Sequence, residues 1–387
     1  MPLRPIYLDA HATTPVDPRV LEVMLPYFTE HFGNPSTNTH LYGWEANAAV
    51  KNAREAIANI INASPEEIVF TSGATEANNL AIKGVAEAYF NKGKHIITVA
   101  TEHRAVLDPC KYLETLGFEV TYLPVKSDGL LDINQLTAAI REDTILVSVM
   151  AANNEIGVLQ PLKEIGNICH NQGVLFHTDA AQAIAKIPFD VAAMNIDLMS
   201  LTAHKIYGPK GIGALYVRRR NPRVKIASQL QGGGQERGRR SGTLYTPQIV
   251  GFAEALKLGV GAMESESKRL FKLKKQLWSM FKSVEGVYLN GNLNNSLPGN
   301  LNISIEGVDG SALLLGLQSV VALSSGSACS STSTAPSHVL TALGRDKKLA
   351  HASLRFGIGR FNTPEEIKTV GENAIAVIQP LRQANNY

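Results

Sequence analysis

Short apolar runs alternate with longer segments over the first half of this 387-residue chain, and this alternation limits the possible folds more than any other feature. The runs occupy residues 68–70, 95–99, 119–123, 145–150, 174–178 and 198–201, and the segments between them are long enough for crossover helices. Strands joined in this way form a mostly parallel sheet that is covered on both faces. In such sheets ligands bind beyond the carboxyl ends of the strands. The sequence therefore predicts an α/β fold with its functional site along that edge.

The second half of the chain has a different rhythm. A helical pattern runs from residue 247 to about 282, and short strand-like runs follow at 287–289, 301–305 and 354–358 before a closing helix at 364–381. We expect an N-terminal arm of residues 1–18 that packs with the small domain, a large domain of residues 19–258, and a small α+β domain of residues 259–387. Segment 324–337 is dense in serine, threonine and alanine, and we expect a mobile loop there.

Composition and charge exclude several classes of protein. Hydrophobic residues make up 44% of the chain and charged residues 18%, which is typical of a globular enzyme and not of a disordered protein. The net charge of +3 gives no reason to expect nucleic acid or a membrane as a partner. The N-terminus has the pattern of neither a secretory signal nor a transit peptide, and three cysteines without Cys-x-x-Cys spacing indicate a reducing compartment. We expect a cytoplasmic protein and assign no metal site.

Lys205 lies where an apolar run stops and a glycine-proline turn begins, on the connection between strands predicted at 198–201 and 212–217. By itself, such a lysine is most simply a solvated loop charge. Asp179, however, follows the buried run at 174–178, so both side chains are expected at the same edge of the sheet. An aldehyde cofactor bound to a lysine requires a carboxylate at its pyridinium nitrogen. Asp179 and Lys205 are therefore candidates for the two ends of such a site.

Two further stretches follow strands at this edge. Residues 71–79 come after the run at 68–70 and open a helix, which directs backbone N–H groups and a hydroxyl at one point, as an anion requires. The alternative is a capping box with Ser72 or Thr75 as the cap. His103 follows the run at 95–99, and it is either a structural histidine or an imidazole that stacks on a pyridine ring and moves a proton.

Cys329 and Arg355 are candidates for contact with a substrate. Cys329 is either a thiol that swings into a site or an ordinary exposed cysteine, whereas Cys110 and Cys169 occur in helical segments and are expected to be inert. Arg355 alternates with apolar neighbours on a short strand, and it is either a surface arginine or a bidentate clamp for a carboxylate. The basic clusters at 218–220 and 237–240 are interpreted as solvated faces or subunit contacts.

Taken together, motifs in fixed order along nearly the whole chain resemble the cysteine desulfurases of the NifS/IscS type. These belong to the class-V aminotransferase family, within the fold-type I enzymes that use pyridoxal 5'-phosphate. The motifs occupy residues 7–9, 12–15, 33–36, 73–79, 101–103, 153–157, 179–182, 203–205, 240–243 and 324–329. The resemblance implies a fold-type I transferase with a large and a small domain.

The resemblance also implies a role for each matching residue. Lys205 carries the cofactor as a Schiff base, Asp179 binds its pyridine nitrogen, Gln182 binds its phenolic oxygen, and His103 stacks on the ring. The implied phosphate ligands are Ala74, Thr75, Thr202 and His204, with Thr243 reaching in from the second subunit of a homodimer. The implied contacts with the substrate L-cysteine are Asn34, Asn154 and Arg355, of which Asn154 also contacts the cofactor.

The implied reaction is removal of sulfur from L-cysteine, with Lys205 or His103 as the base. It gives L-alanine and a persulfide on Cys329, and the sulfur then passes to an acceptor or to an iron–sulfur scaffold protein. The alternatives are a selenocysteine lyase or another fold-type I lyase or aminotransferase, and, in a different class, a non-catalytic adaptor with this fold.

Overall fold

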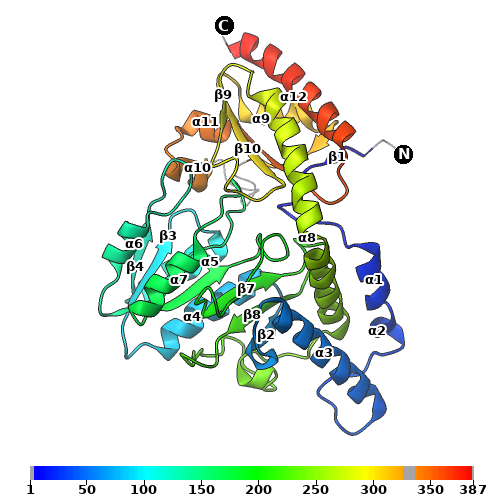
Figure 1. Ribbon diagram of the computed structural model, residues 1–387, viewed down its shortest axis with the longest axis vertical. Helices are drawn as coiled ribbons and strands as arrows, with labels where there is room; N and C mark the ends of the chain where they lie inside the picture. The colour runs from blue at the N-terminus through cyan, green and yellow to red at the C-terminus, as the bar shows by residue number, and fades with distance from the viewer. Residues whose placement is uncertain (1–3, 326–335, 386–387) are drawn as a thin grey trace.

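A seven-stranded sheet forms the centre of the larger part of the molecule (Figure 1). The computed structural model describes residues 4–325 and 336–385. Across the sheet the strands are β2 (Ile68–Thr71), β8 (Gly213–Val217), β7 (Leu198–Thr202), β6 (Leu175–Asp179), β5 (Thr144–Ser148), β3 (His95–Val99) and β4 (Glu119–Leu123). β8 is antiparallel to β2 and β7, and the pairings from β7 to β4 are parallel. The predicted mostly parallel α/β fold is confirmed.

Helices cover both faces of this sheet because successive strand residues point to opposite sides. In β2, for example, Val69 packs into one hydrophobic cluster while Ile68 and Phe70 pack into the other. The first cluster includes α4 (Ala74–Ala88) and α5 (Arg104–Thr115). The second includes α3 (Leu41–Ile60), α6 (Ile133–Ala139), α7 (Leu162–Asn171) and the first half of α8 (Thr246–Phe281). Both clusters leave the strand ends free to carry functional side chains.

The smaller part of the molecule contains an antiparallel sheet in the order β12 (Ser353–Gly357), β10 (Asn300–Ile305) and β9 (Val287–Leu289). Its helices are α9 (Gly310–Leu317), α10 (His338–Ala342), α11 (Lys347–His351) and α12 (Pro364–Asn385). The N-terminal strand β1 (Ile6–Tyr7) pairs with β11 (Val321–Ala322), and Leu8 is buried in the same hydrophobic cluster as β10 and β12. Two short helices, α1 (Pro18–Met24) and α2 (Pro26–Thr29), then lead into the larger part.

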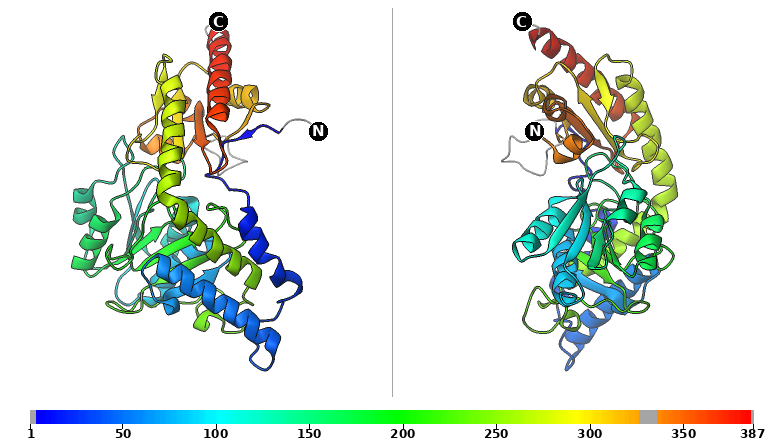
Figure 2. Two further views of the ribbon diagram at one scale, coloured as in Figure 1. Left: turned by 45° about the vertical axis from the view of Figure 1, so that its right-hand side comes forward. Right: turned by 90° about the vertical axis from the view of Figure 1, so that its left-hand side faces the viewer.

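The long helix α8 connects the two parts (Figures 1 and 2). Its first half contributes Ile249 and Phe252 to the core of the larger part, and its second half contributes Leu273 and Leu277 to the core of the smaller part. The domain boundary predicted at residue 258 falls inside this helix and stays a prediction. Within residues 4–325 and 336–385, no helix combines the length and the apolar character that a membrane span requires.

The interpretation of the basic clusters as solvated faces or subunit contacts is wrong for Arg218. Arg218 is buried, donates hydrogen bonds to the backbone carbonyls of Val191 and Ile196, and forms an ion pair with Asp197 at 3.1 Å. The Arg218 guanidinium therefore provides hydrogen-bond donors for backbone carbonyls in the turn that precedes β7, and it does not face solvent. A local charge pattern could not predict this, because the acceptors come from a segment more than twenty residues earlier.

Candidate active site

The carboxyl ends of β5, β6 and β7 open into a pocket of about 540 Å³ that also receives side chains from the N-terminal arm and from β12. Most of the predicted site residues line it: Ala74, Thr75, His103, Asn154, Asp179, Gln182, Thr202, His204, Lys205 and Arg355. The sheet places these residues together because parallel strands end at one edge.

Asp179 and Lys205 come from neighbouring strands of that edge. Asp179 is the last residue of β6, where it pairs with Ser200 of β7, and Lys205 follows shortly after β7 ends. The Asp179 carboxylate is 6% exposed, and it accepts a hydrogen bond from Asn78 Nδ2 at 2.7 Å and another from the Ala181 backbone N–H at 2.8 Å. The two donors fix both carboxylate oxygens in the wall of the pocket that Lys205 also lines.

The N-terminus of α4 forms another part of the wall. Gly73 is the N-cap, and no side chain caps the helix, so the capping-box alternative with Ser72 or Thr75 is wrong. The first N–H groups of a helix have no acceptor within it, and they attract an anion. Gly213 of β8 permits the close approach of this turn, because a Cβ there would lie 2.7 Å from Gly73 Cα.

Thr202 and His204 lie beside this helix start. A Cβ at Gly73 would be 3.9 Å from Thr202 Oγ1, and His204 Nδ1 is 3.1 Å from Thr13 Oγ1. Burial, followed by the charge of Lys205, lowers the pKa of His204 to about 4, so its ring is neutral near pH 7. An anion at this end of the pocket would meet backbone N–H groups, a hydroxyl and a neutral imidazole.

His103 is the N-cap of α5 and lines the same pocket. Its Nδ1 accepts a hydrogen bond from the Ala105 backbone N–H at 3.0 Å, so in the neutral ring the proton is on Nε2. Burial, and then the charge of Lys205, lowers the pKa of His103, which favours this neutral form. The imidazole therefore presents a donor, not a free lone pair, at Nε2.

Arg355 enters the pocket from β12, because its neighbours Leu354 and Phe356 point the other way into the core. It is 2% exposed and donates from Nη2 to Asp9 Oδ1 at 2.8 Å and from Nη1 to the Asn154 carbonyl at 3.1 Å. Among the described residues its Nε has no acceptor although it is buried. A fixed guanidinium with an unsatisfied N–H, in a pocket, is suited to a carboxylate ligand.

Two predicted residues, Asn34 and Thr243, do not line this pocket. Asn34 is exposed, and its side chain accepts a hydrogen bond from the Ser36 N–H at 2.9 Å. Thr243 is also exposed and does not line the pocket of its own chain. Cys329 lies outside the described residues. The roles predicted for all three stay predictions.

Sequence reasoning missed three residues that the fold brings to the site. Asn78 holds Asp179, Asp9 holds Arg355, and His11 lies against Gln182 at 3.2 Å. Asn78 and Asp9 stand in motifs that resemble the family, whereas His11 lies between two of these motifs. The role of each of these side chains becomes clear only from its hydrogen-bond partner, which lies about 100 to 350 residues away in sequence.

The profile of the class-V aminotransferase family ("Aminotransferase class-V") matches residues 6–370. The chain therefore belongs to this family, whose members are enzymes that depend on pyridoxal 5'-phosphate.

Proteins named cysteine desulfurase are among those similar to this chain. The human protein named cysteine desulfurase is 55% identical over 382 residues, which is 98% of this chain and 83% of that protein. The cysteine desulfurase IscS of Methylobacillus flagellatus is 57% identical over 94% of this chain and 89% of its own length. A solved structure of a NifS-like protein superposes with a TM-score of 0.90 at 39% identity, covering 98% of this chain and all of that one. A second, titled SspA in complex with cysteine, gives a TM-score of 0.81 at 40% identity, covering 92% of this chain and all of the other.

The pocket fits the cofactor of the family. It offers an amine, a fixed carboxylate and a helix N-terminus beside a hydroxyl, which suit the aldehyde, the pyridine nitrogen and the phosphate of pyridoxal phosphate. Arg355, a fixed guanidinium that lines the same pocket, is left over for a further anionic group.

Proposed function

We propose that this enzyme removes sulfur from L-cysteine, releases L-alanine and takes the sulfur as a persulfide on Cys329. The observation that carries the proposal is the single pocket shared by Lys205, Asp179 and a buried arginine with an unsatisfied N–H. The relatives named cysteine desulfurase support the choice of substrate.

Pyridoxal phosphate supplies an electron sink for the negative charge that develops at the α carbon of an amino acid. In this proposal Lys205 anchors the cofactor, Asp179 keeps its pyridine nitrogen protonated, Gln182 donates to its phenolic oxygen, and the start of α4 holds its phosphate. Ala74, Thr75, Thr202 and His204 are the proposed phosphate contacts, and Asn154 contacts both cofactor and substrate.

The hydrogen bond at His103 Nδ1 decides between the two candidate bases, Lys205 and His103. A neutral histidine whose Nδ1 already accepts from Ala105 has no free lone pair for a substrate proton. We therefore assign removal of the α proton to the Lys205 amine. His103 stacks on the ring and holds a proton at Nε2.

Arg355 is proposed to bind the substrate carboxylate. Asp9 and the Asn154 carbonyl hold two of its nitrogens, so the guanidinium is oriented before substrate arrives. This contact directs the α carbon of cysteine toward the pocket wall that Lys205 lines. The thiol of Cys329 then accepts the substrate's sulfur as a nucleophile.

The test is to purify the protein and record the absorption of the bound cofactor, to check in one sample that borohydride removes this absorption, and to supply L-cysteine with a thiol reductant to a second, untreated sample. The proposal predicts alanine and sulfide in equal amounts. Cys329→Ser should keep the cofactor band and lose sulfide release, whereas Cys110→Ser, which alters a buried thiol, should release sulfide normally. Pyruvate and ammonia as products, or sulfide release that survives Cys329→Ser, would favour another lyase, including a selenocysteine lyase.

We further propose a homodimer in which Thr243 completes the phosphate site of the other subunit. Exposed apolar side chains support it. Tyr245, two residues from Thr243, is one of them, and the others are Leu25, Phe28, Phe32 and Trp44. Phe32 is 62% exposed and Trp44 55%, which is unusual for large apolar side chains that meet only water. Phe28 packs edge-on against Tyr245 across α2 and the start of α8, so these two side chains form a continuous surface.

Mixing subunits tests the shared site. Lys205→Ala and Thr243→Ala proteins, each impaired alone, should regain cofactor affinity and activity when they are unfolded and refolded together, because one site of each mixed dimer is then intact. A monomer in light scattering, or no gain on mixing, would contradict the shared site.

We propose that the protein works in a reducing compartment, the cytoplasm. We also propose that it passes the sulfur to an acceptor protein, such as an iron–sulfur scaffold. The name IscS among bacterial relatives supports the first, but relatives from Arabidopsis thaliana and Encephalitozoon cuniculi are named mitochondrial and mitosomal. Cell fractionation with an antibody to the chain decides the compartment, and capture of the persulfide-loaded protein with a candidate acceptor tests the transfer.

A further inference from the structure

A single residue of the N-terminal arm contacts both ends of the Gln182 side chain. Gln182 Nε2 donates to the backbone carbonyl of His11 at 2.9 Å, and Gln182 Oε1 lies 3.2 Å from His11 Nδ1. Both side chains are 3% exposed. Because a buried carboxamide seldom leaves either end without a partner, these two contacts decide which way the amide faces.

The pair of contacts also fixes the protonation of His11. The amide nitrogen must donate to the His11 carbonyl, so the amide oxygen accepts, and His11 Nδ1 must carry the hydrogen. Reversing the amide would put two oxygens against each other at the carbonyl. Burial, followed by the charges of Lys186, Arg355 and Lys205, lowers the pKa of His11 well below its usual value, so the ring stays neutral.

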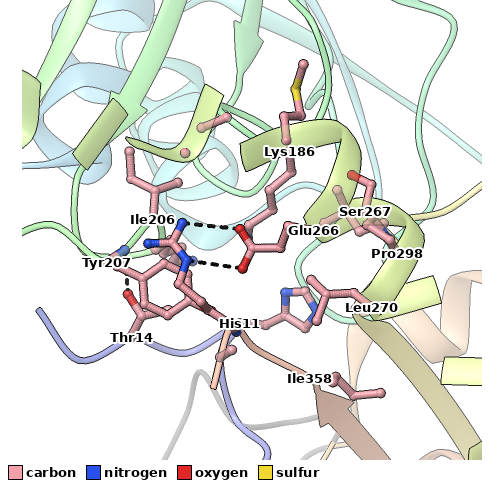
Figure 3. A pocket seen from close by; sticks show the side chains of 18 residues that line it. His11, Thr14, Lys186, Ile206, Tyr207, Glu266, Ser267, Leu270, Pro298 and Ile358 are labelled. Carbon is pink, nitrogen blue, oxygen red and sulfur yellow. Dashed lines mark hydrogen bonds and ion pairs between the residues drawn. The ribbon is translucent and has the colours of Figure 1, made fainter. Parts of the chain in front are cut away.

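The other ring nitrogen of His11 faces away from this contact. His11 also lines a second, small cavity, of about 40 Å³, with Lys186 and the ion pair of Glu266 with Arg360 (Figure 3). Among the described residues, His11 Nε2 is buried without a partner there. The imidazole therefore forms part of the wall between the two cavities, and its one hydrogen is committed to Gln182.

One hydrogen of the Gln182 amide has no acceptor among the described residues, and Gln182 lines the pocket of Lys205 and Asp179. We propose that His11 is a positioning residue, which holds the Gln182 amide in the orientation that presents this N–H to the phenolic oxygen of the cofactor. The inference rests on the proposed function, because it requires a cofactor in that pocket.

The test uses the pH titration of the visible absorption band of the holoenzyme. A hydrogen bond donated to the phenolic oxygen stabilises its anion, so the chromophore releases its proton at a lower pH. Loss of a hydrogen bond of about 0.5 to 1.5 kcal/mol corresponds to an upward shift of about 0.4 to 1 pH unit. His11→Leu and Gln182→Leu should each give this shift, and the double variant should shift no further than Gln182→Leu alone.

Two variants serve as controls. His11→Asn places an amide N–H near the position of Nδ1, so it should restore a midpoint close to that of the wild type. His95→Leu removes a buried histidine that also makes two hydrogen bonds but starts β3 and lines neither cavity, so it should leave the midpoint unchanged. If His11→Leu does not fold, as judged by circular dichroism, His11→Ala takes its place.

The possible outcomes distinguish a failure of the role proposed for His11 from a failure of the proposed function. A wild-type midpoint in His11→Leu alongside a shifted Gln182→Leu, or additive shifts in the double variant, overturns the role of His11 and leaves the proposed function standing. If Gln182→Leu shows no shift, the contact of Gln182 with the cofactor is wrong, and the role of His11 fails with it. Failure of the wild type to take up pyridoxal phosphate refutes the proposed function itself.

Discussion

Replacing Arg355 with lysine removes the guanidinium fork but keeps a positive charge in the pocket. In the wild type, Asp9 Oδ1 and the Asn154 carbonyl occupy two of the three nitrogens, at 2.8 and 3.1 Å. The third nitrogen, Nε, is buried and has no acceptor among the described residues. A lysine ammonium can keep the contact with Asp9, but it has no planar fork to offer a carboxylate from that position.

The expected loss follows from this geometry. A hydrogen bond to a charged group contributes about 1.5 to 3 kcal/mol, and each 1.36 kcal/mol is a factor of ten in rate, so kcat/KM for L-cysteine should fall by about 10- to 150-fold. Because the carboxylate is bound in the ground state as well as in the transition state, most of the loss should appear in KM.

Steady-state sulfide and alanine release over a range of L-cysteine concentrations measures both constants. The cofactor band of Arg355→Lys should match that of the wild type, because Arg355 is assigned no contact with the cofactor. Arg345→Lys is the matched control: Arg345 makes two hydrogen bonds at 2.8 Å in the same part of the molecule, to Asn290 Oδ1 and the Leu289 carbonyl, and does not line the pocket. An unchanged kcat/KM in Arg355→Lys, or an equal loss in the control, would refute a carboxylate clamp.

Two predictions concern stability. Burial raises the pKa of Glu155 to about 7, despite the hydrogen bond from Ser337, so the folded state holds this proton above the pH at which the unfolded chain loses it. The stability that this group contributes is therefore lost as pH rises from about 4.5 to above 7. When urea unfolding is measured at pH 5 and at pH 8.5, the free energy of unfolding of Glu155→Gln relative to that of the wild type should increase by about 1 to 3 kcal/mol. An equal difference at both pH values counts against this prediction. Glu236 pairs with Arg54 at 2.6 Å and accepts from the Phe70 N–H, and both charged side chains are largely buried, so Glu236→Ala should cost about 3 to 5 kcal/mol in the same assay. A loss below 1 kcal/mol would mean that water reaches Arg54.

The sequence predicted the large features because they depend on local patterns. β3 and β4 have the bounds of their apolar runs, and α8 begins and ends within one residue of its predicted range, since periodicity and turn residues are local. The position of Lys205 between two strands was likewise predicted, because a strand end can be recognised without its neighbours.

The alternatives that sequence left open needed the packed structure. Ser72 and Thr75 have the composition of helix caps, yet the N-cap of α4 is Gly73, whose φ is +154° and whose Cα lies against Gly213 of the neighbouring strand, where a Cβ would be 2.7 Å away. Arg218 is part of a basic run, yet it is buried against carbonyls. In each case the deciding contact comes from a segment distant in sequence, and hydrophobic patterning carries no information about such contacts.

The order of strands and helices, the edge of the sheet that carries the chemistry, and the identity of the amine and carboxylate there could all be predicted from the amino-acid sequence. How those groups are held could be seen only in the folded chain: Asn78 on Asp179, Asp9 on Arg355, and His11 on Gln182. This difference arises because element formation depends on the residues within one turn or strand, whereas the orientation of a buried polar side chain depends on whichever donor or acceptor the fold places beside it.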